Sequence, residues 1–251
     1  GATMTIAAGI TLTGGSGTGT LSVAGTLNAV GASSANRNVV FDNVVVSFQP
    51  SGTGTLQFCT LQTTRLGYLV LLQGTPTVTS CTITNGGAST YGLYVVAGTP
   101  TISGNTITAY IGIYVPAGTP MISGNTLTAR NSGLYYGGGG GTASGNTIGF
   151  SGTASGRYGI YVSSTATPTL DGNTILDDVQ RSDIAISAQG TATGVQIINN
   201  TVHVSGGDYA LRLSPPLFQA GSEVSGNNFP TGLATGVLLT GEATGLVTVG
   251  A

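Results

Sequence analysis

A short block of the chain recurs almost letter for letter. Residues 97–109 read AGTPTISGNTITA, and residues 117–129 read AGTPMISGNTLTA. Weaker copies run through most of the sequence, with their Asn-Thr-Ile tripeptides 17 to 27 residues apart. Such a repeat is typical of a solenoid, because one unit cannot bury its own apolar face and must stack on its neighbours.

Aligning the copies gives three short strands per winding. The first position of the Asn-Thr-Ile tripeptide is taken by Asp42, Cys59, Cys81, Asn105, Asn125, Asn146, Asn173, Asn200 and Asn227. A Gly-Leu/Ile-Tyr-Val strand follows at 92–95, 112–115, 133–136 and 159–162, with looser copies at 68–71, 183–186, 210–213 and 236–239. A Thr-Pro-Thr-Ile-Ser strand precedes each Gly-Asn corner.

These strands predict an all-β fold, a single-stranded right-handed parallel β-helix (β-solenoid) of roughly nine to eleven coils, since parallel connections are right-handed. We expect one domain over residues 1–251. It divides into N-terminal coils (1–35), regular repeats (36–230) and a C-terminal coil (231–251).

Strand alternation assigns the inside and the outside of this coil. Ile102, Ile107, Ile113 and Val115 point inward, and the tyrosine of each Gly-Ile-Tyr-Val strand points outward. The asparagine column predicts an internal ladder of amide hydrogen bonds at a tight corner where Asn tolerates left-handed geometry. Asp42 and the two cysteines extend this column.

Charge is scarce, with six arginines, no lysine and eight acidic residues. This composition excludes the basic footprint of a nucleic-acid-binding protein and gives no means of binding an anionic membrane. A charge-poor surface rich in Thr and Gly indicates an extracellular protein, secreted or at the cell surface. No apolar run is long enough to insert into a membrane. Because the chain begins at Gly1, we expect a processed product or an excised piece.

The two cysteines occupy the same repeat position in consecutive windings, so they are close enough for a disulfide. The alternative is a pair of small buried thiols. No further ligands accompany them, so we expect neither a metal nor another cofactor.

Two outward columns are candidate binding surfaces. The first is aromatic and consists of Tyr94, Tyr114, Tyr135 and Tyr161, flanked by Val70 on one side and by Ala185, Arg212 and Leu238 on the other. These rings can stack on sugars or on another chain, or merely on one another.

The second column is polar. Its paired threonines are Thr82 with Thr84, Thr106 with Thr108 and Thr126 with Thr128, continued singly by Thr60, Thr147, Thr174 and Thr201. The pattern resembles the Thr-x-Thr arrays of β-solenoid antifreeze proteins, which implies ice binding. Gly149, Leu176 and His203 interrupt it, and Thr is also a favoured residue of ordinary exposed strands.

The repeat as a whole resembles the pectate-lyase-like superfamily of right-handed parallel β-helices, especially its bacterial secreted and surface members with Gly-Asn-Thr-Ile repeats. The resemblance covers roughly residues 36 to 230 and implies a fold more than an activity. Members that cleave polysaccharides use grouped carboxylates, bound calcium and an Arg or Lys base. The candidates here for such chemistry are Asp177, Asp178, Arg181, Asp183 and His203.

This cluster lacks the Gly-His-Gly and Arg-Ile-Lys partners of polygalacturonases, and a solvated loop explains it equally well. The residues therefore favour a non-catalytic extracellular structural or adhesive element. Terminal segments without a capping helix favour self-association, head to tail or lateral, into a surface filament. The alternatives are a protein that binds or cleaves a polysaccharide, as a lyase or glycoside hydrolase, and an ice-binding protein.

Overall fold

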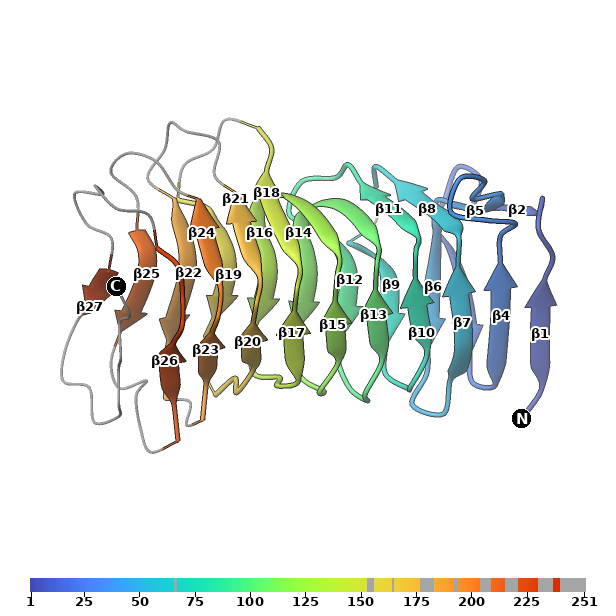
Figure 1. Cartoon of the computed structure of the whole chain (residues 1–251). Helices are drawn as coiled ribbons and strands as arrows, with labels where there is room; N and C mark the ends of the chain where they lie inside the picture. Colours follow the sequence, from blue (N-terminus) through green and yellow to red (C-terminus); the bar gives the residue numbers. More distant parts are fainter. Residues whose placement is uncertain are drawn as a thin grey trace.

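The computed structural model describes residues 1–65, 67–152, 156–163, 165–176, 183–191, 194–203, 209–214, 221–229 and 237–239. Across these ranges the chain forms strands and no helix, and every pairing between named strands is parallel. The strands stack into an elongated rod, with the N-terminus at one end and β27 (Val237–Leu239) towards the other (Figure 1). The predicted all-β parallel solenoid is confirmed.

The rod has three faces, and most windings contribute one strand to each face. Among the described residues, the first face is a sheet of ten strands, one from each winding that they form. In stacking order these are β1 (Thr3–Ile6), β4 (Thr26–Val30), β7 (Thr53–Gln57), β10 (Thr77–Thr79), β13 (Thr101–Ser103), β15 (Met121–Ser123), β17 (Thr142–Ser144), β20 (Thr169–Asp171), β23 (Gln196–Ile198) and β26 (Glu223–Ser225).

The second and third faces share one hydrogen-bonded sheet, because β14 (Thr106–Val115) and β16 (Thr126–Tyr136) bend from one face into the other. The remaining strands of the second face are β2 (Thr11–Thr13), β5 (Val39–Asp42), β8 (Cys59–Thr63), β11 (Thr82–Asn85), β18 (Thr147–Phe150), β21 (Thr174–Leu176) and β24 (Thr201–His203). Those of the third face are β3 (Gly19–Val23), β6 (Val44–Phe48), β9 (Tyr68–Leu72), β12 (Tyr91–Val95), β19 (Tyr158–Val162), β22 (Ile184–Gln189), β25 (Tyr209–Ser214) and β27.

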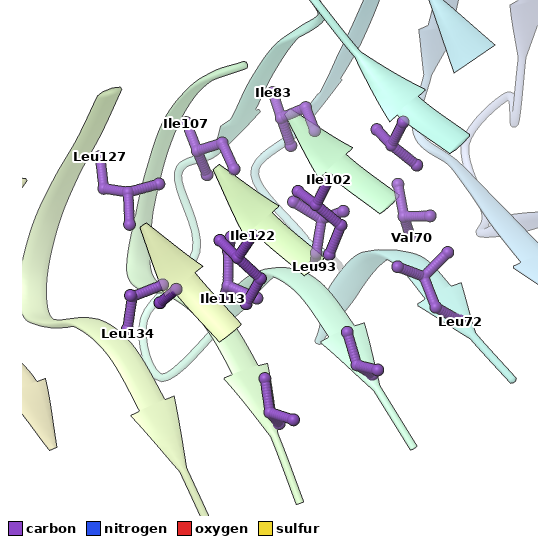
Figure 2. Packing of buried hydrophobic residues seen from close by; sticks show 14 of the residues in the cluster. Val70, Leu72, Ile83, Leu93, Ile102, Ile107, Ile113, Ile122, Leu127 and Leu134 are labelled. Atoms are coloured by element: carbon purple, nitrogen blue, oxygen red, sulfur yellow. The ribbon is translucent and has the colours of Figure 1, made fainter. Parts of the chain in front are cut away.

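The core is a set of parallel files of aliphatic side chains inside the coil. Leu93, Ile113 and Leu134 occupy one register position on the third face and are fully buried. Ile83, Ile107 and Leu127 do the same on the second face, and Figure 2 shows the files facing one another. Each such side chain contributes about 1.5–3 kcal/mol by burial.

The predicted asparagine ladder is present and buried. Oδ1 of Asn125 accepts hydrogen bonds from the backbone N–H of Asn105 at 3.0 Å and from its Nδ2 at 2.9 Å. Nδ2 of Asn125 in turn donates to Oδ1 of Asn146 and to the carbonyl of Ile102. The same pattern continues through Asn173 and Asn200 to Asn227, so each amide inside the ladder binds both the preceding winding and the next.

Two details of the predicted ladder are wrong. The left-handed residue is the one before the asparagine, as at Gly124 with a φ of 61°. Asp42 does not extend the column, because Val39 pairs with Cys59 and Asp42 pairs with Gln62. Asp42 ends β5 at the turn from the second to the third face, where Asn43 takes a left-handed φ of 56°. The Asp-Asn-Val tripeptide therefore marks a different corner from Asn-Thr-Ile.

Cys59 and Cys81 continue the ladder as two free, buried thiols. Cys81 donates its backbone N–H to Oδ1 of Asn105 at 2.9 Å. The Sγ of Cys59 donates to the carbonyl of Ala29 at 3.2 Å. A hydrogen bond with Cys81 and burial both raise the pKa of the Cys59 thiol. Of the two interpretations of the cysteines, the structure contains the buried thiols.

Candidate binding surface

The predicted tyrosine column lies on the third face. Tyr94 pairs with Tyr114, Tyr114 with Tyr135, and Tyr135 with Tyr161, and all four side chains are half-buried and point away from the core. The hydrophobic neighbours on both sides of each tyrosine, such as Leu93 and Val95, are buried. The alternation of the strand thus brings the phenols outward as predicted.

The predicted flanks of this column need correction at two positions. Leu71, and not Val70, pairs with Tyr94, and Val70 is buried in the core. Ser187, and not Ala185, pairs with Tyr161. The predicted position is one residue off at Val70 and two residues off at Ala185. Both strands lack the Gly-x-Tyr motif that fixes the register of the other copies. Arg212 and Leu238 lie in the column as predicted.

A second set of tyrosines lies beside the first, and the repeat pattern of the sequence did not predict it. Tyr68, Tyr91 and Tyr158 are half-buried on the same face, each three residues before the outward position of its own strand. Strict alternation places such a residue inside, but both Gly92 and Leu93 of β12 are buried, so the alternation breaks at the glycine. The signal that marks these residues is the motif Tyr-Gly-Leu/Ile-Tyr, at 91–94 and 158–161.

Together these side chains form a continuous aromatic surface, which we call the tyrosine face. Its members are Tyr68, Tyr91, Tyr94, Tyr114, Tyr135, Tyr158 and Tyr161. The ring centroids of Tyr94 and Tyr114 are 5.3 Å apart at an interplanar angle of 17°. The angle opens to 38° between Tyr114 and Tyr135 and to 51° between Tyr135 and Tyr161.

This mutual stacking decides which part of each phenol meets a ligand. Both flat sides of Tyr114 are covered, by Tyr91 and Tyr94 on one side and by Tyr135 on the other. The inner rings therefore present their edges and hydroxyls, and only rings at the ends of the stack retain a flat side for a sugar. The alternative interpretation, in which the rings stack on one another, describes the interior of the tyrosine face.

Burial favours the neutral form of three phenols of this surface, those of Tyr91, Tyr114 and Tyr161. Burial, with smaller contributions from Tyr135, Tyr94 and Tyr91, raises the pKa of Tyr114. Burial also raises the pKa of Tyr161, against an opposing effect of the nearby Arg212 cation. Each hydroxyl can thus donate one hydrogen bond and accept others, which suits a polyhydroxylated ligand.

The threonine column is present on the second face. Thr60, Thr82, Thr106, Thr126, Thr147, Thr174 and Thr201 pair in register from winding to winding. The second threonines, Thr84, Thr108 and Thr128, also pair in register, and Gly149 then replaces threonine in the next winding. Leu176 is a 41% exposed apolar side chain on the same face. Ice binding by this surface stays a prediction.

The catalytic candidates are only partly within the described residues. Asp177, Asp178 and Arg181 lie outside them. His203 is exposed at the end of β24. Asp183 is 1% exposed and forms an ion pair with the fully buried Arg157, with Nη2 and Oδ2 2.5 Å apart. Its Oδ1 accepts the backbone N–H of Arg157 at 2.9 Å, so a solvated loop does not describe Asp183.

The arginine of this pair also packs on an aromatic ring, with its guanidinium carbon 4.6 Å from the centroid of Phe150. The pair thus joins two successive windings just before β19 and β22. Within the described ranges, no three His, Cys, Asp or Glu side chains are grouped to hold a metal ion. The same part of the chain contains no helix long and apolar enough to cross a membrane.

The chain belongs to the right-handed β-helix family. The family model described as "Right handed beta helix region" matches residues 66–229. This match confirms the predicted hand of the coil together with its parallel architecture. No curated protein matches the sequence.

Solved structures with a similar course of chain include two tailspike proteins. One is the tailspike protein of E. coli bacteriophage HK620 in complex with a pentasaccharide, with 15% identity and a TM-score of 0.46. The other is the Dettilon tailspike protein, with 17% identity and a TM-score of 0.46. The similarity covers 90% and 88% of this chain and 60% of each tailspike chain. The chain therefore spans less than two thirds of their length, and its family membership rests on the family model alone.

Proposed function

We propose that this protein is a non-catalytic, extracellular adhesive β-helix that holds an extended polysaccharide along the tyrosine face. The observation that carries the proposal is the row of stacked, half-buried phenols across successive windings. A contiguous exposed aromatic surface is a common mark of a binding site. The rings recur in five successive windings, and this repetition suits a ligand that is itself a repeating chain.

A non-catalytic role is supported by the state of Asp183. A glycoside hydrolase needs two carboxyl groups at a defined separation, of which one gives up a proton and the other stabilises or attacks. Asp183 is buried and bound to Arg157 at 2.5 Å, which leaves its carboxylate engaged in holding two windings together. The extracellular setting is supported by the scarcity of charge along the whole sequence.

A glycan array, followed by calorimetry on the glycans that bind, tests this function. We expect Tyr114→Ala to weaken binding about tenfold, since an aromatic contact contributes about 0.5–1.5 kcal/mol. Tyr114→Phe removes the hydroxyl and keeps the ring, so it distinguishes the contribution of the hydroxyl to binding from that of the ring edge. Tyr209→Ala is the matched control, because Tyr209 lies on the third face outside the ring contacts of the tyrosine face.

Reducing-sugar and unsaturated-product assays on the same glycans are expected to show no cleavage. Product release from any of them contradicts the non-catalytic part of the proposal. Absence of binding across the array, with folded protein, contradicts the adhesive part.

A second candidate function, the subunit of a head-to-tail filament, is favoured by the first winding. Met4 in β1 and Ile10 just before β2 are each 45% exposed. Exposed apolar side chains on strands favour association with another copy.

A further inference from the structure

A polar pocket of about 260 Å³ lies at the corner between the second and third faces. Its lining includes Asp42 from β5, Gln62 and Thr63 from β8, and Thr84 from β11. Asp42 pairs in register with Gln62, and Gln62 with Thr84, so three outward polar side chains form one file across three windings. Towards the next winding this file continues into the threonine column, since Thr84 pairs in register with Thr108.

The carboxylate of Asp42 has spare hydrogen-bonding capacity. Its Oδ1 receives only long contacts, from Nε2 of Gln62 at 3.4 Å and from Nδ2 of Asn43 at 3.5 Å. No donor among the described residues contacts its Oδ2. Hydrogen bonds of this length are weak, whereas an ionised carboxylate accepts strong hydrogen bonds through both oxygens. A ligand with two neighbouring hydroxyls would fit these acceptors.

The walls of the pocket are held in place from behind. Oγ1 of the buried Thr63 donates to Oδ1 of Asn43 at 2.9 Å, and the backbone N–H of Gly86 donates to the carbonyl of Thr63 at 2.8 Å. Arg130 donates to the carbonyl of Gly86 at 3.1 Å and to those of its two neighbours in the chain. Since Asp42 is the one charged residue of the lining, the pocket disfavours an anionic ligand.

The pocket is close to the tyrosine face along the chain. Thr64 precedes Tyr68 by four residues and Gly86 precedes Tyr91 by five, so each link spans at most roughly 13–18 Å. The buried Asn85 fastens this corner to the third face, because its Nδ2 donates to the carbonyl of Tyr91 at 3.0 Å. A short oligosaccharide can therefore contact both surfaces.

We propose that this corner pocket binds one neutral sugar residue of the polysaccharide, with Asp42 accepting hydrogen bonds from adjacent hydroxyls. Its volume is below the roughly 300–1,000 Å³ of drug-sized sites, which suits a single sugar ring. The inference rests on the proposed function and adds to it the part of the ligand that is recognised by polar contacts. The tyrosine face contacts several units of the extended polysaccharide, and the pocket selects for neutral, hydroxyl-rich units.

The test uses the whole chain with neutral probes. Dextran, galactan and mannan are titrated calorimetrically, and D-glucose, D-galactose and D-mannose are examined by saturation-transfer NMR. The variants are Asp42→Asn, Gln62→Ala and Tyr114→Ala, each checked for folding by circular dichroism. Asp171→Asn is the control, because the carboxylate of Asp171 lies on the first face and accepts a hydrogen bond from Asn199 at 3.0 Å.

We expect Asp42→Asn to weaken the binding of at least one probe tenfold or more. Asp171→Asn should leave the affinity for every probe unchanged. Binding that is lost in Tyr114→Ala but unchanged in Asp42→Asn and Gln62→Ala overturns the pocket and leaves the proposed function standing. Asp42-dependent binding of a monosaccharide, with polysaccharide binding absent, supports the pocket and overturns the proposed function. No binding of any probe overturns both.

Discussion

At the residue scale, the corner before each ladder asparagine selects its residue by backbone conformation. Glycine with a φ near 60° occupies this corner at Gly104, Gly124, Gly145, Gly172 and Gly226. A left-handed backbone brings Cβ close to the following carbonyl in any other L-residue. Ser80 and Phe58 nevertheless take the same conformation, with φ values of 53° and 52°, so the corner tolerates the strain in some windings.

We expect Gly124→Ala to lower the free energy of unfolding by about 1–2 kcal/mol, through this strain alone. A Cβ at Gly124 meets no atom within 4 Å, so no steric clash adds to the cost. Gly149→Ala is the control, because it has the same open surroundings without a positive φ. The measurement is the denaturant midpoint, and equal midpoints for the two variants contradict the backbone argument.

Also at the residue scale, Tyr136 places a polar hydroxyl inside the otherwise apolar core. It occupies the file of Val115 and Val162, is fully buried, and its hydroxyl has no hydrogen-bond partner among the residues that the structure describes. Burial raises the pKa of this phenol above its usual range, so the group stays neutral. An unsatisfied buried hydroxyl costs free energy that the folded protein does not recover.

Tyr136→Phe is therefore expected to raise the free energy of unfolding by about 1 kcal/mol. Tyr135→Phe, which removes a hydroxyl from the neighbouring half-buried ring, should change it little. Both are measured by urea denaturation. A loss of stability in Tyr136→Phe means that the hydroxyl has a partner in solution.

At the scale of elements, the asparagine ladder ties the strands of neighbouring windings together. From Asn125 to Asn200, each Oδ1 accepts two hydrogen bonds from the preceding winding, and each Nδ2 donates to the following one. Buried polar groups stabilise a core only when all of them are satisfied. The ladder meets this condition by repetition, because every rung supplies what its neighbour lacks.

Removing one rung by Asn125→Ala takes away the acceptor of the Asn105 backbone N–H and one of the two acceptors of its Nδ2, the other being the carbonyl of Val78. We expect a loss of about 3 kcal/mol or more, since each stranded group costs about 1–3 kcal/mol. Thr126→Ala, at the adjacent exposed position, should cost far less. A thermal midpoint of Asn125→Ala close to that of Thr126→Ala argues against the ladder as a source of stability.

The tyrosine face predicts a pH dependence in alkaline solution. Burial raises the pKa values of Tyr91, Tyr114 and Tyr161 in the folded chain, while the unfolded chain titrates near the ordinary value of about 10. The corresponding stability is complete below that value and is lost as the pH rises through the folded pKa values. Urea midpoints should fall above about pH 10, less steeply in Tyr114→Phe. Midpoints independent of pH in this range contradict the burial of the phenols.

At the scale of the whole molecule, the rod has few charges and carries the exposed apolar side chains of Met4 and Ile10 in its first winding. Neither feature opposes association along the rod axis. If copies join head to tail, the contact does not close into a ring and produces a fibre. Charged residues placed on an edge strand are a known way to prevent such pairing.

Electron microscopy of concentrated protein is expected to show rods longer than one molecule if the filament candidate is correct. Met4→Lys places a charge beside β1, where Met4 is 45% exposed, and should shorten or abolish them. Thr84→Lys, on the exposed second face, is the matched control. Dispersed single rods of wild-type protein at every concentration contradict the filament.

Repetition made much of this architecture predictable. Residues at equivalent positions of consecutive repeats must lie above one another in a solenoid, so the alignment alone predicted the files of Asn125, Tyr114 and Thr106. The register of the looser copies was not predictable in the same way. A corner that is one residue longer or shorter shifts the register without changing any recognisable motif, as at Asp42 and Leu71. The role of Tyr91 was missed for a related reason, since a bend at Gly92 overrides strand alternation.

The sequence by itself determined the parallel winding, the inward aliphatic files and the outward column from Tyr94 to Tyr161, because these depend on a periodicity that the letters carry. Only the tertiary structure decided what meets at the corners and between remote positions: the stacking of Tyr68, Tyr91 and Tyr158 on that column, the buried Arg157–Asp183 pair and the pocket at Asp42. The physical reason is that a file follows from the repeat, whereas a contact across a bend follows from the local path of the backbone, which varies from winding to winding.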